Sequence, residues 1–166
     1  MRMSMDGGYR WDSIPGPKFC SDVLLLGERS MMVANYSKIL LTEDTGLTWR
    51  TVMCDSTVSF HTILHAGDSI FIQAMPSRDS NGRLFVSDLS MQSWTVRTSP
   101  FAMMKMMYYQ NHVWYLNNDW YPWIWEEKYH FGRIDTVGGI ASTPLGNIHA
   151  SACIPHPEAG MLFATD

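Results

Sequence analysis

The chain of 166 residues is 46% hydrophobic, 13% aromatic and 17% charged, with a formal net charge of -4. That length is enough to bury one core without disulfides or metals, so we expect a single domain over residues 1–166. Because the 12 Lys and Arg residues are scattered, the composition excludes a general attraction to phosphate backbones or anionic lipid. Neither nucleic acid nor a membrane is an expected partner.

The cysteines and the N-terminal region indicate where the chain is found. Cys20, Cys54 and Cys153 are odd in number and widely spaced, which indicates neither a disulfide framework nor a zinc site and fits a reducing compartment. Residues 1–16 lack the apolar stretch of a signal peptide, and no apolar run approaches the roughly 20 residues of a membrane helix. We expect a protein of cytoplasmic origin that is not secreted by a signal peptide and that can be incorporated into a virion.

Short apolar runs separated by turn residues follow one another along the chain. In chain order, paired runs occupy residues 23–26 and 31–34, 60–64 and 69–74, 102–109 and 112–116, and 148–154 and 161–165. Such pairs predict antiparallel hairpins. Third strands are expected at residues 37–42, 82–88 and 130–135, and fourth strands at 48–53 and 93–98. Methionine propensity would also allow a helix over residues 102–109, but the place of this stretch in the repeat favours a strand.

The turn between the third and fourth strands carries a repeated motif. Residues 42–49 read TEDTGLTW, and residues 4–11 read SMDGGYRW, with Arg10 in place of the second Thr. A weaker copy at residues 87–94, SDLSMQSW, has its Asp one position earlier and Met91 in place of Gly. A fourth trace around Asp135 keeps the Asp without a Trp. The motif recurs at about 40 residues, which is the length of one propeller blade.

Each residue type of the motif has a structural reason to be there. The Asp accepts hydrogen bonds from backbone N–H groups of its own turn, the Gly adopts a positive φ, and the Trp packs into the sheet. Structural roles are therefore expected for Asp6, Gly8, Trp11, Asp44, Gly46, Trp49, Asp88, Trp94 and Asp135.

The motif resembles the Asp-box, or BNR repeat, of sialidase-like and sortilin-like β-propellers. The resemblance implies an all-β fold, a small β-propeller of about four antiparallel four-stranded blades. Its ring would be closed by pairing of the N- and C-terminal strands, which removes the open edges. Blades shared between chains, or an arc of a larger propeller, are the alternatives.

The same resemblance raises the question of catalysis. A sialidase-like site would need an arginine triad, a Tyr with a Glu partner and an acid/base Asp. No Phe/Tyr-Arg-Ile-Pro segment precedes residues 4–11, and the arginines lie mostly in or next to the motif turns and loops. Phosphate-binding loops and a Ser-His-Asp pattern do not occur either. We expect no enzymatic activity and no cofactor, and a sialidase-like glycoside hydrolase ranks last among the functions considered.

Residues 117–130, NNDWYPWIWEEKYH, hold an unusual number of large rings for a predicted loop. These rings are Trp120, Tyr121, Trp123, Trp125 and Tyr129. Exposed Trp and Tyr side chains stack on sugars and anchor protein interfaces, so the segment is a candidate binding surface. The alternative is that the rings pack down to cap a small propeller or fill a subunit contact.

Histidines and methionines form two further groups. His61 and His65 are four residues apart in a predicted strand and are expected to share a face, with His149 and His156 in the equivalent region of the last unit. The arrangement would suit a metal ion in a central channel, but hydrogen-bonded histidines are commoner, so no metal site is expected. Four methionines, Met103, Met104, Met106 and Met107, are expected to fill an irregular core rather than to form an adaptable contact surface.

Taken together, these features favour a function exerted through the surface. The expected role is a non-enzymatic structural or interaction scaffold in a larger assembly, with a protein partner or self-association. A virus or phage particle is one concrete form of such an assembly. A glycan-binding module that uses the Trp-rich segment is the second class, and the hydrolase is the third.

Overall fold

Every regular element in the described part of the chain is a β-strand, which confirms the all-β prediction. The computed structural model describes residues 2–4, 6–76, 81–99, 105–119, 128–134, 140–144, 150–156 and 160–165. Residues 105–109 form a strand rather than a helix, and residues 102–104 lie outside the described residues. Nowhere in these ranges is there a helix long and apolar enough to cross a membrane.

Three antiparallel four-stranded sheets are each built from four consecutive strands. The first sheet contains β3 (Asp22–Leu25), β4 (Met31–Asn35), β5 (Lys38–Thr42) and β6 (Arg50–Cys54). The second sheet contains β7 (Val58–Ala66), β8 (Ser69–Pro76), β9 (Gly82–Asp88) and β10 (Thr95–Ser99). The third sheet contains β11 (Lys105–Tyr109), β12 (His112–Asp119), β13 (Lys128–Ile134) and β14 (Ile140–Pro144). The order of strands in each sheet follows the predicted hairpins and third strands.

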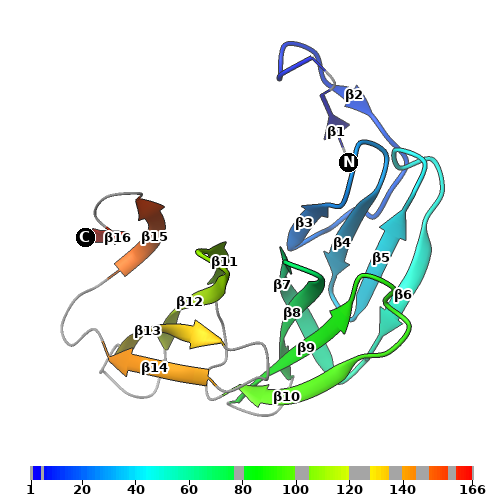
Figure 1. Ribbon diagram of the computed structural model, residues 1–166. Coiled ribbons are helices and arrows are strands. Elements are labelled where there is room, and N and C mark those ends of the chain that lie inside the picture. The colour runs from blue at the N-terminus through cyan, green and yellow to red at the C-terminus, as the bar shows by residue number, and fades with distance from the viewer. Residues whose placement is uncertain are drawn as a thin grey trace.

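Two shorter antiparallel sheets flank these three. The N-terminal hairpin pairs β1 (Arg2–Met3) with β2 (Asp12–Ser13), and the C-terminal hairpin pairs β15 (Ala150–His156) with β16 (Gly160–Thr165). The two hairpins are separate sheets. The described strands therefore form an open arc, with the N- and C-terminal hairpins on opposite sides of its opening (Figure 1).

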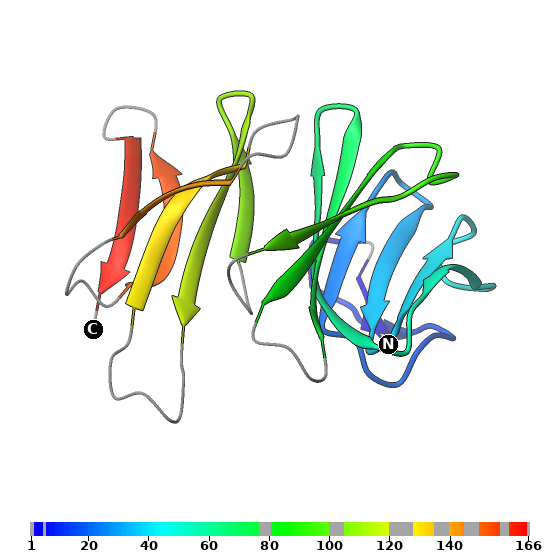
Figure 2. The same cartoon turned by 90° about the horizontal axis from the view of Figure 1, so that it is seen from below.

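The strands run in the same order outward in each of the three large sheets. β3, β7 and β11 line the inner side of the arc, while β6, β10 and β14 lie on its outer side (Figure 1). The end of β4 and the facing ends of β12 and β13 lie at one end of the sheets, and the β7–β8 and β11–β12 turns lie at the other (Figure 2). The β4–β5 turn thus lies at the same end of the sheets as the paired ends of β12 and β13.

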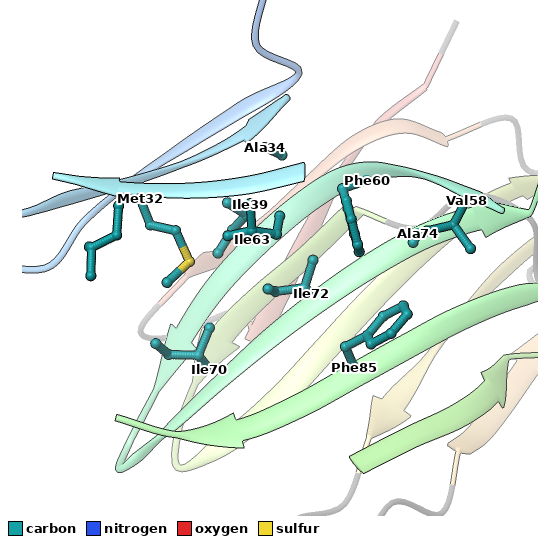
Figure 3. Close-up of a cluster of buried hydrophobic side chains, with 11 residues drawn as sticks. Met32, Ala34, Ile39, Val58, Phe60, Ile63, Ile70, Ile72, Ala74 and Phe85 are labelled. Atoms are coloured by element: carbon teal, nitrogen blue, oxygen red, sulfur yellow. The ribbon is translucent and has the colours of Figure 1, made fainter. Parts of the chain in front are cut away.

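The second sheet is the centre of the core because both of its faces are covered. On one face Ile70, Ile72 and Ala74 of β8 join a buried cluster with residues of the first sheet (Figure 3). On the other face Phe71 joins a second cluster with Val113 of the third sheet. A strand that is buried on both faces reads as a continuous apolar run, as residues 70–72 do, instead of alternating with polar residues.

A first prediction concerns this doubly covered strand. Ile72 is fully buried, so Ile72→Ala should lower the free energy of unfolding by about 2–5 kcal/mol, because it removes buried methyl groups and leaves a cavity. Val96→Ala is the matched control, since Val96 lies on outer strand β10 and is exposed, and it should cost less than about 0.5 kcal/mol. Urea unfolding followed by tryptophan fluorescence measures both, and equal losses would contradict the central place given to β8.

Candidate functional site

Two turns, which we name the first Asp turn (residues 4–11) and the second Asp turn (residues 42–49), are held by matching sets of local hydrogen bonds. In the second, the Thr42 hydroxyl donates to Asp44 Oδ1 at 2.7 Å, and Thr48 N donates to the same oxygen at 2.9 Å. Gly46 N donates to the Thr42 hydroxyl at 2.9 Å, and Trp49 Nε1 donates to Gly46 O at 3.1 Å. The carboxylate thereby joins the two ends of the turn.

The first Asp turn repeats this pattern bond for bond. The Ser4 hydroxyl and Arg10 N both donate to Asp6 Oδ1 at 2.9 Å. Gly8 N donates to the Ser4 hydroxyl at 2.7 Å, and Trp11 Nε1 donates to Gly8 O at 3.0 Å. Two segments far apart in the chain therefore form the same turn from the same residue types, and this identity of geometry supports reading them as copies of one unit.

Hydrogen bonds to a carboxylate favour its charged form. The Thr48 hydroxyl, which donates to Asp44 Oδ2 at 2.6 Å, is the main cause of a lowered pKa of Asp44, to about 2. The pKa of Asp6 is lowered chiefly by the backbone N–H of Arg10. Both side chains are ionised acceptors committed to their turns, which suits a structural role rather than proton transfer.

The two Asp turns differ in what covers them. Gly46 packs under Ile14, and the Trp49 ring packs on Gly16 while its Nε1 also donates to Pro15 O at 2.9 Å. The segment 14–16, which follows β2, thus crosses the second Asp turn. On the first Asp turn Trp11 is 57% exposed and Tyr9 is 94% exposed, so this turn presents aromatic surface to solvent.

The third copy, residues 87–94, forms a different turn. Asp88 accepts from the N–H and hydroxyl of Ser90, two residues on, and does not reach across the turn as Asp44 does. Met91 takes the positive φ of 55° where Gly46 has 88°, and the buried Trp94 Nε1 has no hydrogen-bond partner. The displaced Asp explains this loss of the shared pattern. Asp135 lies outside the described residues.

The Trp-rich segment is shorter than the predicted loop. Residues 117–119 end β12 and residues 128–130 begin β13, and the two stretches pair, with Tyr129 opposite Asn118. Tyr129 is therefore on a strand, contrary to its predicted place in a loop. Asn and Asp are poor strand formers, which is why residues 117–119 read as loop. The other four rings, Trp120, Tyr121, Trp123 and Trp125, lie outside the described residues.

The histidine prediction assumed regular alternation along β7, and that assumption is wrong. The register of β7 against β8 shifts between Phe60 and Thr62, so His61 lies at a β-bulge. His61 is half-buried and His65 is exposed. No group of three His, Cys, Asp or Glu side chains that could hold a metal occurs among the residues that the structure describes. His149 and the side chain of His156 lie outside them.

Met106 and Met107, the two members of the methionine group that the structure describes, make different contacts. Met106 packs against the core between the second and third sheets. The Met107 sulfur lies 4.0 Å from the Cys153 sulfur, and burial raises the pKa of the Cys153 thiol to about 11. Met106 therefore fills core as expected, and Met107 joins the third sheet to β15. Met103 and Met104 lie outside the described residues.

A pocket of about 280 Å³ lies where the first and second sheets meet at the inner side of the arc. Its lining residues are Phe19, Cys20, Ser21, Tyr36, Ser59 and His61. They come from the segment before β3, the β4–β5 turn and the start of β7. Sequence reasoning missed this site, and its one local signal was a Tyr at the first position of a two-residue hairpin turn, where Gly is usual.

A second prediction tests the glycine of each Asp turn. A Cβ on Gly46 would lie 2.8 Å from Ile14 Cδ1, whereas Gly8 has no such close neighbour, and both have positive φ. Gly8→Ala should lower the free energy of unfolding by at most about 1–2 kcal/mol, because Ala is strained in the left-handed backbone conformation. Gly46→Ala should lower it by about 1 kcal/mol more, because its Cβ also clashes with Ile14. Ile14→Val removes the clashing methyl and should recover the extra loss in the double variant. Thermal and urea unfolding measure these differences, and the absence of recovery would rule out the proposed contact.

A third prediction follows from the pKa of Asp44. Because the pKa is lowered from 3.8 to about 2 on folding, ionised Asp44 stabilises the fold above about pH 4, and this contribution is lost as the pH falls toward 2. The difference in unfolding free energy between wild type and Asp44→Asn should therefore be largest near neutral pH and shrink below pH 4. Asp68→Asn, in the β7–β8 turn, controls for removal of one surface charge. A difference that grows on acidification would contradict the assignment.

No family model, curated protein or solved structure matches this chain in the comparisons made. The two matching Asp turns, the partly uncovered ends of the arc and the pocket are therefore the features from which a function is inferred.

Proposed function

We propose that the chain is a non-enzymatic scaffold that works through its surface in a larger assembly, by contact with a protein partner or with itself. The observation that carries the proposal is apolar surface at both ends of the arc. Leu25 on β3 is 68% exposed, Ile154 on β15 is 60% exposed, and Trp11 and Tyr9 are exposed on the first Asp turn. Exposed apolar patches mark interaction sites in soluble proteins.

The sheet faces at the opening of the arc show why these side chains are uncovered. On β3, Leu24 packs against the core shared with the second sheet, so its neighbours Val23 and Leu25 point to the other face of the first sheet. On β15, Cys153 meets Met107 of the third sheet, so Ile154 points away from that sheet. Each end of the arc thus carries an apolar face that has no further sheet packed on it within the described part of the chain.

We propose further that these faces are completed by one more four-stranded unit. In the first and second sheets, residues 42–49 and 87–94 join the third strand to the fourth. The first Asp turn joins β1 to β2, so these two strands correspond to a third and a fourth strand. β15 and β16 correspond to a first and second strand by their order after the third sheet. Pairing of the two hairpins would give a fourth Asp-box blade and a small closed β-propeller. The pairing can be made within one chain or between chains, or the sheets can belong to an arc of a larger propeller.

The chemistry of the described side chains supports a non-catalytic role. The four carboxylates with lowered pKa values, Asp6, Asp44, Asp55 and Asp88, are each hydrogen-bonded within a turn. A glycoside hydrolase instead needs a carboxyl group whose pKa is raised, beside a second carboxylate. A particle of a virus or phage is one assembly in which such a scaffold would serve, and glycan binding by the Trp-rich segment is the alternative function.

A fourth prediction tests the apolar face. Leu25→Glu places a charge on it, and Val96→Glu places the same charge on outer strand β10. If chains associate through the face, light scattering after size exclusion should show wild-type oligomers that Leu25→Glu dissociates and Val96→Glu does not. If the hairpins close within one chain, Leu25→Glu should instead lower the unfolding free energy by about 1–3 kcal/mol more than Val96→Glu. A monomer in which both variants have equal stability would refute the proposal.

A further inference from the structure

We propose that the pocket between the first and second sheets binds a single uncharged pyranose ring of a sugar. This inference goes beyond the scaffold role and does not depend on how the open arc is completed. None of the six lining residues belongs to the Trp-rich segment. Three properties of the pocket support it, namely a fixed frame, two converging aromatic rings and a set of neutral polar groups.

The frame of the pocket is fixed by hydrogen bonds between the first and second sheets. The Ser21 hydroxyl donates to Phe60 O at 2.7 Å, and Phe60 N donates to Tyr36 O at 2.7 Å. Ile63 N, just past the β-bulge, donates to Asp22 Oδ2 at 2.8 Å, and the Asn35 amide donates to Phe19 O. The backbone on all sides of the pocket is therefore held before any ligand arrives, which lowers the entropic cost of binding.

Two aromatic rings form the wall of the pocket. The ring centroids of Phe19 and Tyr36 are 6.2 Å apart at an angle of 60°. Phe19 is 64% exposed and Tyr36 is 62% exposed, although large rings of this kind normally contribute to stability through burial. The two tilted rings leave a corner in which the C–H face of a sugar ring can rest on one of them and its edge on the other.

The backbone of Tyr36 indicates that this ring is present for a reason other than folding. Tyr36 has φ 47°, and it is the first residue of the two-residue turn between β4 and β5. A bulky side chain in the left-handed region costs about 1–2 kcal/mol, and Gly is the ordinary choice at such a position. Strain of this kind is concentrated at binding and catalytic sites.

The polar groups of the pocket are neutral and in part unengaged. The β-bulge places His61 in the lining of the pocket, and a rotation of its ring would bring the Nε2 atom, which is buried and has no hydrogen-bond partner, to the ligand. Burial lowers the pKa of His61, so the imidazole is uncharged at neutral pH. Ser59 contributes a hydroxyl, and no Lys, Arg, Asp or Glu lines the pocket. Hydroxyl groups of an uncharged ligand match this set, whereas a carboxylate or phosphate would find no cation.

The size of the pocket limits the ligand to one ring. A volume of about 280 Å³ is at the lower end of the roughly 300–1,000 Å³ of pockets for drug-sized molecules. With so few contacts, binding of one ring should be weak, with a Kd on the order of 1 mM. Such a site would bind a glycan that is presented in many copies, because an assembly of several scaffold chains would raise the avidity for that glycan.

The fifth prediction uses saturation-transfer NMR on the full chain with the methyl β-glycosides of glucose, galactose and N-acetylglucosamine as probes. At least one probe should show saturable transfer, and Tyr36→Gly should weaken it at least tenfold. Because Tyr36→Gly also relieves the strained backbone, the variant should be as stable as wild type or more stable. Gln110→Gly is the matched control: Gln110 has φ 49° at the same position of the β11–β12 turn, and it lies at the other end of the sheets. His61→Phe keeps a planar aromatic ring, removes the imidazole nitrogens and should also weaken binding.

A chemical readout of the same site comes from the cysteines. Cys20 lines the pocket, whereas Cys54 is exposed elsewhere on the chain. The probe that binds by NMR, added at saturation, should slow alkylation of Cys20 by iodoacetamide severalfold and leave Cys54 unchanged. The proposal is overturned if none of the three probes shows saturable transfer at 10 mM, roughly ten times the expected Kd. It is overturned equally if Tyr36→Gly binds like wild type, or if binding is lost only in Trp123→Ala, which would place the sugar on the Trp-rich segment.

Discussion

Burial of β8 on both faces is the constraint on which the rest of the structure depends. A strand whose successive residues Ile70, Phe71 and Ile72 are all buried needs a packed layer on either side. The first and third sheets supply these layers, and each of them is then left with one face that the second sheet cannot cover. The arc and its apolar ends therefore have a common cause, which is why we look for partners at the ends rather than along the outer strands.

The Asp turns show that local bonding and long-range packing are separable in this fold. Oδ1 of Asp6 and Oδ1 of Asp44 each accept from the hydroxyl two residues before and from the backbone N–H four residues on, although the segment 14–16 covers only the second turn. The exposure of Trp11 is thus not a sign of a poorly formed turn. Within the described part of the chain no segment covers this turn, which is complete in itself. A charged carboxylate with short-range partners can stabilise a hairpin before its sheet packs.

Much of the fold could be predicted from the sequence because hairpins are specified locally. Paired apolar runs and turn residues located the strands, including β11, where methionine propensity suggested a helix. The register shift beside His61 could not be predicted, because Asp22, which accepts a hydrogen bond from Ile63 N just past the shift, is remote in sequence. The extension of β12 through residues 117–119 was missed because cross-strand pairing overrode the low strand propensity of Asn and Asp.

The pocket illustrates why a site is harder to predict than a strand. Phe19, Tyr36 and His61 belong to three segments, and hydrogen bonds such as those among Ser21, Phe60 and Tyr36 bring those segments together. None of these residues forms a motif, and a Phe or Tyr in an apolar-rich chain is ordinarily read as core. What distinguishes them is that the fold leaves their rings exposed and holds Tyr36 in a conformation that Gly would adopt at lower cost. Such a conflict between local preference and observed structure is expected where a residue is retained for binding, and it is a property of the folded chain that composition and spacing do not contain.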